Sequence, residues 1–182
     1  IFRSMTFDVK NLFIASDDYS GNGILMIVKL DAASGNYIWS KNFVVNNQQL
    51  AVRSIQTIAD TVFIFYINAQ QIVAFPTTSN LVMLRLNAQT GSIINSLFFD
   101  NPSFSDYYLD GSVYNYHMPA ELVKTADNNF VFSNQVTDGS NKSLNMLCFN
   151  SDGVVQWQRD YPNLNNTGVF AMEQAQNELL LV

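Results

Sequence analysis

The chain has 182 residues, of which 48% are hydrophobic and 13% are charged, so it can bury a substantial core. Its net charge is −6, and its nine Lys and Arg residues are scattered, which disfavours nucleic acid as a partner because polyanions are bound through clustered cations. The apolar runs have the length of strands and fall short of the roughly 18 to 20 residues of a membrane-spanning helix, so no transmembrane segment is expected in this stretch.

One short pattern occurs three times along the chain. It is LDAASGNYIWSKNF at residues 30–43, LNAQTGSIINSLFF at residues 86–99 and FNSDGVVQWQRDY at residues 149–161. An Asp or Asn side chain can accept a hydrogen bond from the backbone two residues later, and glycine tolerates a positive φ, so each copy is predicted to be a β-hairpin. The turn glycines are Gly35, Gly91 and Gly153.

The segments before the hairpins repeat as well. Arg3-Ser4-Met5 and Phe13-Ile14 recur as Arg53-Ser54-Ile55 and Phe63-Ile64, and Leu122 with Phe130-Val131 resembles the same pair of strands. Each repeat therefore has four predicted strands, which in the second copy are residues 52–58, 62–67, 81–87 and 92–98.

The repeats predict an all-β fold, a β-propeller segment of four-stranded antiparallel blades. The blades are expected at about residues 3–52, 53–119 and 120–168, with an incomplete fourth at 169–182. Because a closed ring has about four to eight blades, we expect the chain to be a piece of a longer one. An open stack, or closure through a second chain, is the alternative.

The hairpin LDAASGNYIW resembles the quinoprotein-like propeller repeat, whose blades carry an Asp, a Ser-Gly or Thr-Gly turn and a Trp that docks between neighbouring blades. FNSDGVVQWQRDY resembles a looser variant of that repeat found in bacterial and protist surface proteins. The resemblance covers roughly residues 3–165 and implies structural, blade-docking roles for Trp39, Trp157 and the three turn glycines. Asn95 stands at the Trp position of the middle copy, so that junction must pack differently.

The segment from Asp17 to Gly23 is predicted to join the second and third strands of the first repeat. Asp18, Ser20, Asn22 and Gly23 match the opening of an EF-hand-like loop, but Lys29 occupies the position of the bidentate Glu. A glycine-rich hairpin loop is the simpler interpretation, and the adjacent carboxylates are expected to be solvated. No metal site is assigned.

The matching connection in the second repeat is NAQQIVAFPTTSN at residues 68–80. It is predicted to be a long loop that covers a neighbouring edge, with Pro76 preventing it from extending the strand ladder.

The insertion at residues 100–118 stretches one repeat from about 50 to about 67 residues and combines aromatic with acidic side chains. Long loops of this kind are frequently functional, and Tyr offers contact area with a polar tip, so a protein partner or carbohydrate could bind here. The alternative is a lid folded over the blade. The candidate binding residues are Phe104, Tyr107, Tyr108, Tyr114 and Tyr116.

Two glycosylation sequons begin at Asn141, in a predicted loop, and at Asn165, after a predicted strand. They favour an extracellular or cell-surface location, although such triplets also arise by chance in an Asn-rich chain. The single cysteine, Cys148, lies in an alternating run and is predicted to be a buried small hydrophobe.

Catalytic patterns are weak throughout the sequence. His117 is the only histidine, one His with one Cys cannot hold zinc, and there is no phosphate-binding glycine loop. The expected function is a non-catalytic scaffold or binding module with protein partners or self-assembly and no cofactor. The family resemblance implies one alternative, a fragment of a quinoprotein-type oxidoreductase with pyrroloquinoline quinone and Ca²⁺, although none of that family's functional residues can be placed here. A second alternative is an intracellular propeller adaptor whose sequons are not glycosylated.

Overall fold

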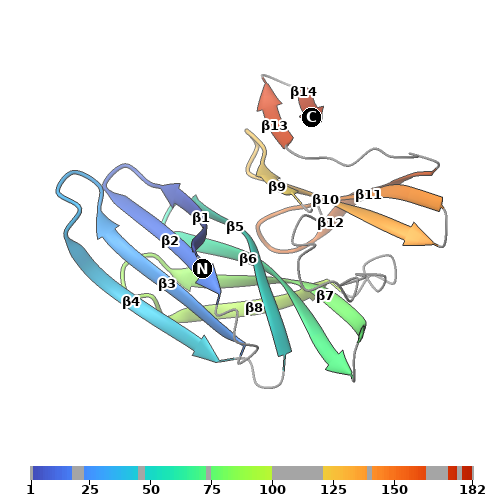
Figure 1. The fold of residues 1–182 in the computed structure, drawn as a ribbon. Coiled ribbons are helices and arrows are strands. Elements are labelled where there is room, and N and C mark those ends of the chain that lie inside the picture. The colour runs from blue at the N-terminus through green and yellow to red at the C-terminus, as the bar shows by residue number, and fades with distance from the viewer. Residues whose placement is uncertain are drawn as a thin grey trace. The chain divides into compact units, whose positions relative to one another are not determined.

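The computed structural model describes residues 2–17, 23–44, 48–72, 75–99, 121–138, 141–162, 172–175 and 178–181. Within these ranges the regular secondary structure is entirely β-strand, in three four-stranded sheets and one two-stranded sheet (Figure 1). The predicted all-β class and the four-stranded antiparallel unit are therefore confirmed.

Each four-stranded sheet is formed by four strands that neighbour one another in chain order. The first sheet has β1 (Phe2–Phe7), β2 (Asn11–Asp17), β3 (Ile24–Asp31) and β4 (Tyr37–Val44). The second has β5 (Gln48–Ile58), β6 (Thr61–Ile72), β7 (Phe75–Asn87) and β8 (Ile93–Phe99). The third has β9 (Glu121–Lys124), β10 (Phe130–Asp138), β11 (Asn141–Phe149) and β12 (Val155–Tyr161), and β13 (Met172–Ala175) pairs with β14 (Glu178–Leu181).

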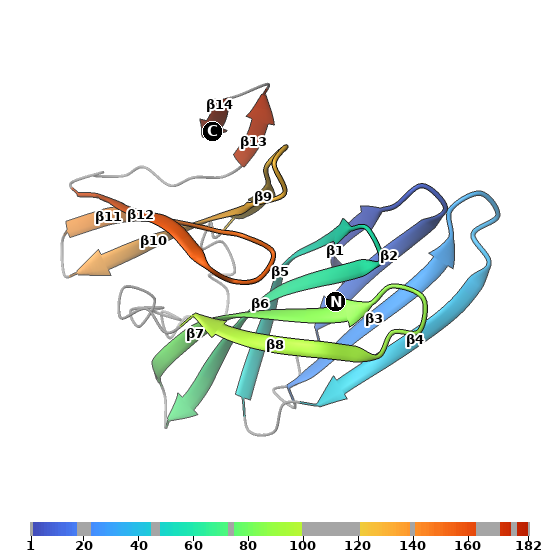
Figure 2. The ribbon, with the colours of Figure 1, turned by 180° about the vertical axis from the view of Figure 1, so that it is seen from behind.

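The chain divides into two compact units. The first comprises residues 1–71 and 80–100 and contains the first sheet and most of the second, and the stacking of these two sheets is seen from both sides in Figures 1 and 2. The second comprises residues 72–79 and 101–182 and contains the start of β7, the third sheet and the β13–β14 pair.

The last two strands of every four-stranded sheet share one register. Lys29 faces Trp39, Arg85 faces Asn95 and Cys148 faces Trp157. In all three sheets the pairing then shifts by one residue, a β-bulge at the step after Lys29, Arg85 or Cys148. A bulge at the same step in three sheets shows that the sequence repeat is also a repeat of backbone geometry.

An Asp or Asn side chain caps each turn that follows a bulge, and the third turn is one residue shorter than the first two. The Asp31 carboxylate accepts a hydrogen bond from the Ser34 N–H at 2.8 Å, and the Asn87 side chain accepts one from the Thr90 N–H at 2.9 Å. In the third turn the Asn150 side chain accepts one from the Val154 N–H at 2.9 Å. The turn glycines all adopt positive φ, at 71° for Gly35, 69° for Gly91 and 81° for Gly153.

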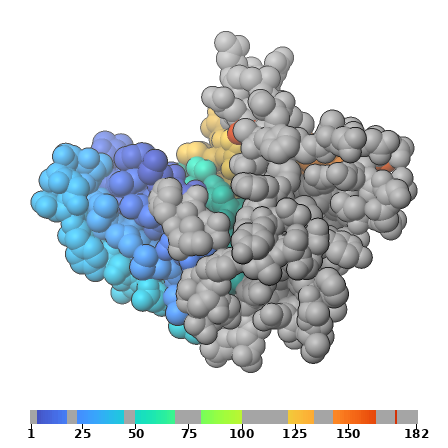
Figure 3. All heavy atoms as spheres, viewed as in Figure 1, coloured from blue at the N-terminus to red at the C-terminus, as the bar shows by residue number. Residues whose placement is uncertain are grey.

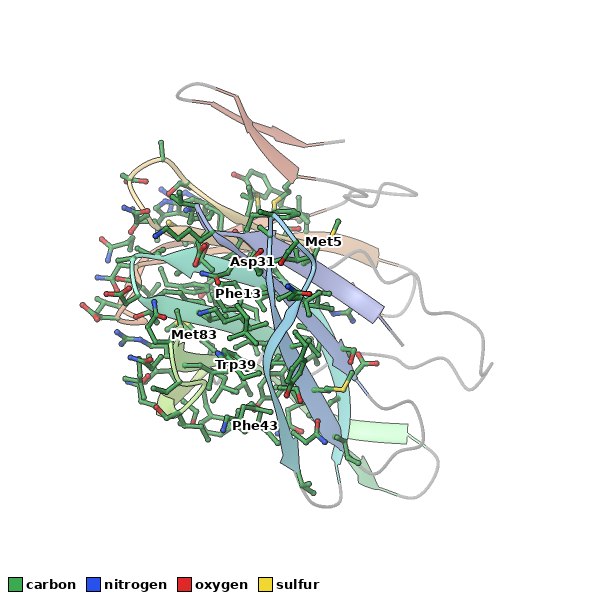
Figure 4. All side chains as sticks on the ribbon, turned by 90° about the vertical axis from the view of Figure 1, so that its left-hand side faces the viewer. Met5, Phe13, Asp31, Trp39, Phe43 and Met83 are labelled. Carbon is green, nitrogen blue, oxygen red and sulfur yellow. The ribbon has the colours of Figure 1, made fainter. Side chains whose placement is uncertain are left out.

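The core of the first unit lies between its two sheets. Alternation along β2 and β3 places Phe13, Ala15, Leu25 and Ile27 on one face, and these side chains are fully buried. They form one apolar cluster with residues of β5, β6 and β7, and Trp39 and Phe43 of β4 pack at its edge. Figure 4 shows Phe13, Trp39 and Phe43 on the side of the first sheet that faces the second, with Met5 on the opposite side.

The third sheet has a separate core in the second unit. Val131, Leu144, Met146 and Cys148 are buried together, and Trp157 packs against them. Met172 of β13 packs against the same cluster, so strand β13 covers part of this face.

The prediction of a long loop at residues 68–80 is wrong. Strand β6 continues to Ile72 and β7 begins at Phe75, so Pro76 lies inside a strand. Among the described residues, β8 pairs with β7 only from Leu81 to Leu86, so the first part of β7 has an edge on that side. A proline without an N–H group is tolerated at such an edge, which explains why it does not end the strand.

Candidate interaction surface

Among the described residues, buried hydrogen bonds join the first sheet to the second at both ends of the interface. The Lys29 Nζ donates a hydrogen bond to the Ala88 carbonyl at 2.9 Å, and it also lies 5.5 Å from the centroid of the Phe13 ring. At the other end the Asp17 carboxylate accepts a hydrogen bond from the Val52 N–H at 2.9 Å. The expectation that Asp17 is a solvated loop carboxylate is therefore wrong, because it ends β2 and is buried between the sheets.

Trp39 marks the edge of this interface. Its side chain is half-buried, and its ring centroid lies 6.1 Å from that of Phe13. A Cβ placed on Gly91, in the turn of the second sheet, would stand 3.2 Å from Trp39 Cε3 and 3.0 Å from Lys41 Cγ. The Trp39 ring thus lies so close to a turn of the neighbouring sheet that a side chain at position 91 would force Trp39 or Lys41 to shift.

The matching positions of the other sheets are occupied differently. Asn95 of the second sheet is half-buried and faces Arg85, whose guanidinium lies 5.7 Å from the centroid of the Phe63 ring. Trp157 of the third sheet is half-buried and packs on the cluster that includes Met172. The cation over a Phe ring is therefore shared by the first two sheets, whereas Cys148 takes that position in the third.

Strand pairing aligns the first sheet with the second residue by residue. The corresponding pairs are Met5–Ile14 with Ile55–Ile64, and Lys29–Trp39 with Arg85–Asn95. This alignment identifies a set of six apolar positions on the face of the first sheet that points away from the second. We call this set the outer face: Met5, Leu12, Ile14, Met26, Val28 and Leu30.

The outer face differs from the matching residues of the second sheet in exposure, while both sets are apolar. Met5 is 55% exposed and Met26 is 40% exposed, and the other four members are partly exposed. The matching residues of the second sheet are buried beneath the first: Ile55, Val62, Ile64, Val82, Leu84 and Leu86. In the third sheet the matching residues of β9, β10 and β11 are also buried: Leu122, Phe130, Phe132, Asn145, Leu147 and Phe149.

The outer face is bordered on β4 by the exposed residues Ser40 and Asn42, which pair with Val28 and Met26, and Phe7, 58% exposed, extends it at the edge strand β1. Figure 3 shows the atoms of β1 to β4, coloured blue to cyan, at the surface of the first unit in the view of Figure 1. A contiguous apolar patch on a folded surface is characteristic of an interaction site. Its chemistry is suited to excluding water against another apolar surface.

Sequence reasoning missed the outer face, although a signal for it was present. The run Leu12-Phe13-Ile14-Ala15 and the run Ile24 to Val28 are apolar on both faces of their strands. A strand with one face in water would alternate apolar and polar residues, so an apolar run predicts cover on both sides.

Several sequence-predicted sites lie outside the described residues. These are the aromatic insertion at residues 100–118 with His117, the sequon at Asn165, and Asp18, Ser20 and Asn22 of the proposed calcium loop. Asn141 was expected in a loop, but it is the first residue of β11 and pairs with Asp138. Gly23, the last residue of the calcium pattern, has a φ of 63°.

No group of three or more His, Cys, Asp or Glu side chains that could hold a metal ion occurs in the described part of the chain. The prediction for Cys148 is confirmed, since its thiol is free and buried. Burial raises the pKa of Cys148, and the nearby negative charge of Asp127 raises it further, so the thiol stays protonated and unreactive near neutral pH.

The ranges that the structure describes contain no helix with the length and hydropathy of a membrane span. The chain matches no protein-family model and no curated protein. The outer face is therefore identified from the geometry of the chain itself.

Proposed function

We propose that this chain is a non-catalytic scaffold or binding module, part of a β-propeller of the quinoprotein-like repeat type. Support for the blade assignment comes from the repeated bulge and turn and from the face-to-face packing of the first two sheets, with Trp39 at their junction. Blades of a propeller are four-stranded antiparallel sheets that stack in this manner.

The observation that carries the binding function is the outer face. Six apolar positions that are buried when a neighbouring sheet covers them are accessible in the first sheet. Burying apolar surface yields roughly 25 cal/mol per Å², so a partner that covers these side chains gains stability from contact alone. The module would then act by holding partners together.

The binding function is tested with an apolar dye and two pairs of lysine substitutions. The unaltered chain should bind anilinonaphthalene sulfonate at the outer face, and the double variant Met5→Lys/Met26→Lys should lose most of that fluorescence, because two ammonium groups break the apolar patch. Ala33→Lys/Gln89→Lys adds the same charge at exposed turn positions of the same unit and should bind the dye normally. Equal fluorescence from both double variants would contradict a binding role for this face.

The oxidoreductase alternative makes a different prediction, binding of pyrroloquinoline quinone with Ca²⁺. We expect no stoichiometric uptake of the quinone in an absorbance titration at saturating Ca²⁺. Tight binding of one quinone per chain would overturn the non-catalytic assignment.

An extracellular or cell-surface location is part of the proposal, and it is supported by the two sequons at Asn141 and Asn165. The intact mass of the protein from its native source, measured before and after glycosidase treatment, tests this. A mass that does not change would favour the intracellular adaptor.

A further inference from the structure

The interface between the first and second sheets shows what covers a face of this kind. Over the buried counterparts of the outer face lie Phe13, Ala15, Leu25 and Ile27, with Trp39 and Phe43 at the margin. One buried cation accompanies this apolar surface, since Lys29 reaches across to the Ala88 carbonyl. The cover is therefore a strand face with a defined apolar and cationic composition.

The outer face matches the covered face at each of its six positions in apolar character. Met5 corresponds to Ile55, Ile14 to Ile64 and Val28 to Leu84, and none of the six pairs combines an apolar with a polar residue. Packing depends on volume and shape as well as hydrophobicity, and exchanges among Met, Ile, Leu and Val are well tolerated. The same kind of cover can therefore pack on both faces.

The polar end of the interface is preserved too. Ala88, which accepts the Lys29 hydrogen bond, is held by its own N–H, which donates to the Asp60 carbonyl at 2.8 Å. Ala32 is the matching residue of the first sheet, and its N–H donates to the Lys10 carbonyl at the same 2.8 Å. Ala88 is buried and Ala32 is exposed. The turn of the first sheet therefore has the same backbone hydrogen bond as the turn of the second sheet. Its Ala32 carbonyl could accept a hydrogen bond from a cation of a covering sheet, as the Ala88 carbonyl does from Lys29.

We infer that the outer face binds a four-stranded antiparallel sheet whose contacting face carries a Trp at the position of Trp39 and a Lys or Arg at the position of Lys29. This inference rests on the proposed binding function and adds the identity of the partner as a sheet of the same repeat type. The cation of the partner reaches the Ala32 carbonyl, and its aromatic residue lies against the β3–β4 turn. The apolar residues between them cover Ile14 and Val28.

The test supplies such a sheet on the full chain. An additional copy of residues 1–47 is fused before Ile1, with the copy's own Met5 and Met26 changed to Leu so that oxidation of these methionines reports on the original sheet alone. Peroxide converts accessible Met to the sulfoxide, and peptide mass spectrometry measures the rate at each position. We expect Met5 and Met26 of the original sheet to oxidise about ten-fold more slowly in the extended chain than in the unextended one.

A matched control separates cover by the sheet from shielding by any added segment. In this control the additional copy carries Ile27→Asp and Trp39→Asp on the contacting face, and Met5 and Met26 should remain as reactive as in the unextended chain. Unchanged oxidation in the chain with the unmodified contacting face would overturn the inference. So would an additional copy that remains unfolded and is digested by protease, because the outer face should provide the surface on which it folds.

Failure of this inference is distinguishable from failure of the proposed function. If the dye binds at the outer face while the additional sheet gives no protection, the face binds a partner of another kind. Sedimentation of the unextended chain identifies one such case, because concentration-dependent dimers abolished by Met5→Lys/Met26→Lys would show that a second copy is the occupant and would contradict the sheet proposal.

Discussion

The first and second sheets present the same kinds of side chain at the same strand positions in opposite environments. Ile64 is fully buried beneath the first sheet, whereas its counterpart Ile14 is partly exposed on the outer face. Ile55 is likewise buried, and its counterpart Met5 is 55% exposed. Burial of these positions is therefore decided by the neighbouring sheet, while the strand sequence decides only that the face is apolar.

The two sheets also differ in what their junction residues contact. Trp39 and Lys29 of the first sheet reach the second sheet through Gly91 and Ala88. In the second sheet, Arg85 stands at the position of Lys29 and lies over the Phe63 ring, whereas Asn95 replaces the indole of Trp39. The covered face of the second sheet and the outer face of the first sheet carry matching residues. A substitution on one face is therefore a control for the same substitution on the other.

The largest expected difference comes from truncating matched isoleucines. Ile64→Ala should lower the free energy of unfolding by about 4 kcal/mol, because it leaves a cavity between two sheets. Ile14→Ala should lower it by about 1 kcal/mol, because solvent and side-chain relaxation fill part of the space. Urea unfolding followed by circular dichroism measures both. Equal losses would show that the outer face is packed as tightly as its counterpart.

The next largest effect is expected at the sheet junction. Trp39→Ala should lower the free energy of unfolding by about 3 kcal/mol, since the half-buried ring packs on the core cluster and on Phe13. Tyr37→Ala, on the same strand and 65% exposed, should cost less than about 1 kcal/mol. If Trp39→Ala lowers the free energy of unfolding no more than Tyr37→Ala does, the indole does not stabilise the junction.

A pair of glycines isolates the close approach between the sheets. Gly35 and Gly91 both have a positive φ, so an alanine at either position should cost about 1 kcal/mol in backbone strain. Around Gly35 there is no atom within 4 Å of an added Cβ, whereas at Gly91 the added carbon meets Trp39 and Lys41. Gly91→Ala should therefore cost about 1 to 2 kcal/mol more than Gly35→Ala. Thermal unfolding of the two variants compares them, and identical shifts would place Trp39 away from the turn.

The smallest effect concerns pH and the first turn. Hydrogen bonds from the Ser34 hydroxyl and N–H lower the pKa of Asp31 below its ordinary value of 3.8. A carboxyl group with a lowered pKa stabilises the fold above pH 3.8, and this contribution is lost as the pH falls through the lowered pKa.

Asp31→Asn should therefore reduce the loss of stability between about pH 4 and about pH 2, because Asn keeps the acceptor and does not titrate. Asn87 performs this role in the second turn, where its side chain accepts the Thr90 N–H. Melting temperatures of both proteins across this range provide the measurement. If the melting temperatures of the two proteins change with pH in parallel, the turn does not stabilise the charged form of Asp31 relative to the protonated form.

Much of the fold could be predicted from the sequence because it is encoded locally. The Asx residue and the glycine of each hairpin specify a turn through short-range hydrogen bonds and φ, so the three hairpins are found where the pattern places them. The strands at residues 68–80 were missed because a proline-containing segment with many polar residues resembles a loop, whereas β6 continues to Ile72 and β7 begins at Phe75 as hydrogen-bonded neighbours in one sheet.

The candidate surface was harder to predict than the turns. Whether an apolar position such as Ile14 is covered depends on which sheet stacks on it, and a pattern within one strand holds no information about that neighbour. The burial of Asp17 has the same origin, since its partner is the Val52 N–H from another sheet, 35 positions along the chain. The aromatic insertion at residues 100–118 stays a prediction.

Oxidation of the methionines in the unaltered chain tests the central claim most directly. Met5 and Met26 lie on the uncovered outer face, and Met83 is fully buried on β7 (Figure 4 labels Met5 and Met83). Under dilute peroxide, Met5 and Met26 should convert to the sulfoxide about ten-fold faster than Met83, as resolved by peptide mass spectrometry. Equal slow oxidation of all three would contradict an uncovered face on the first sheet.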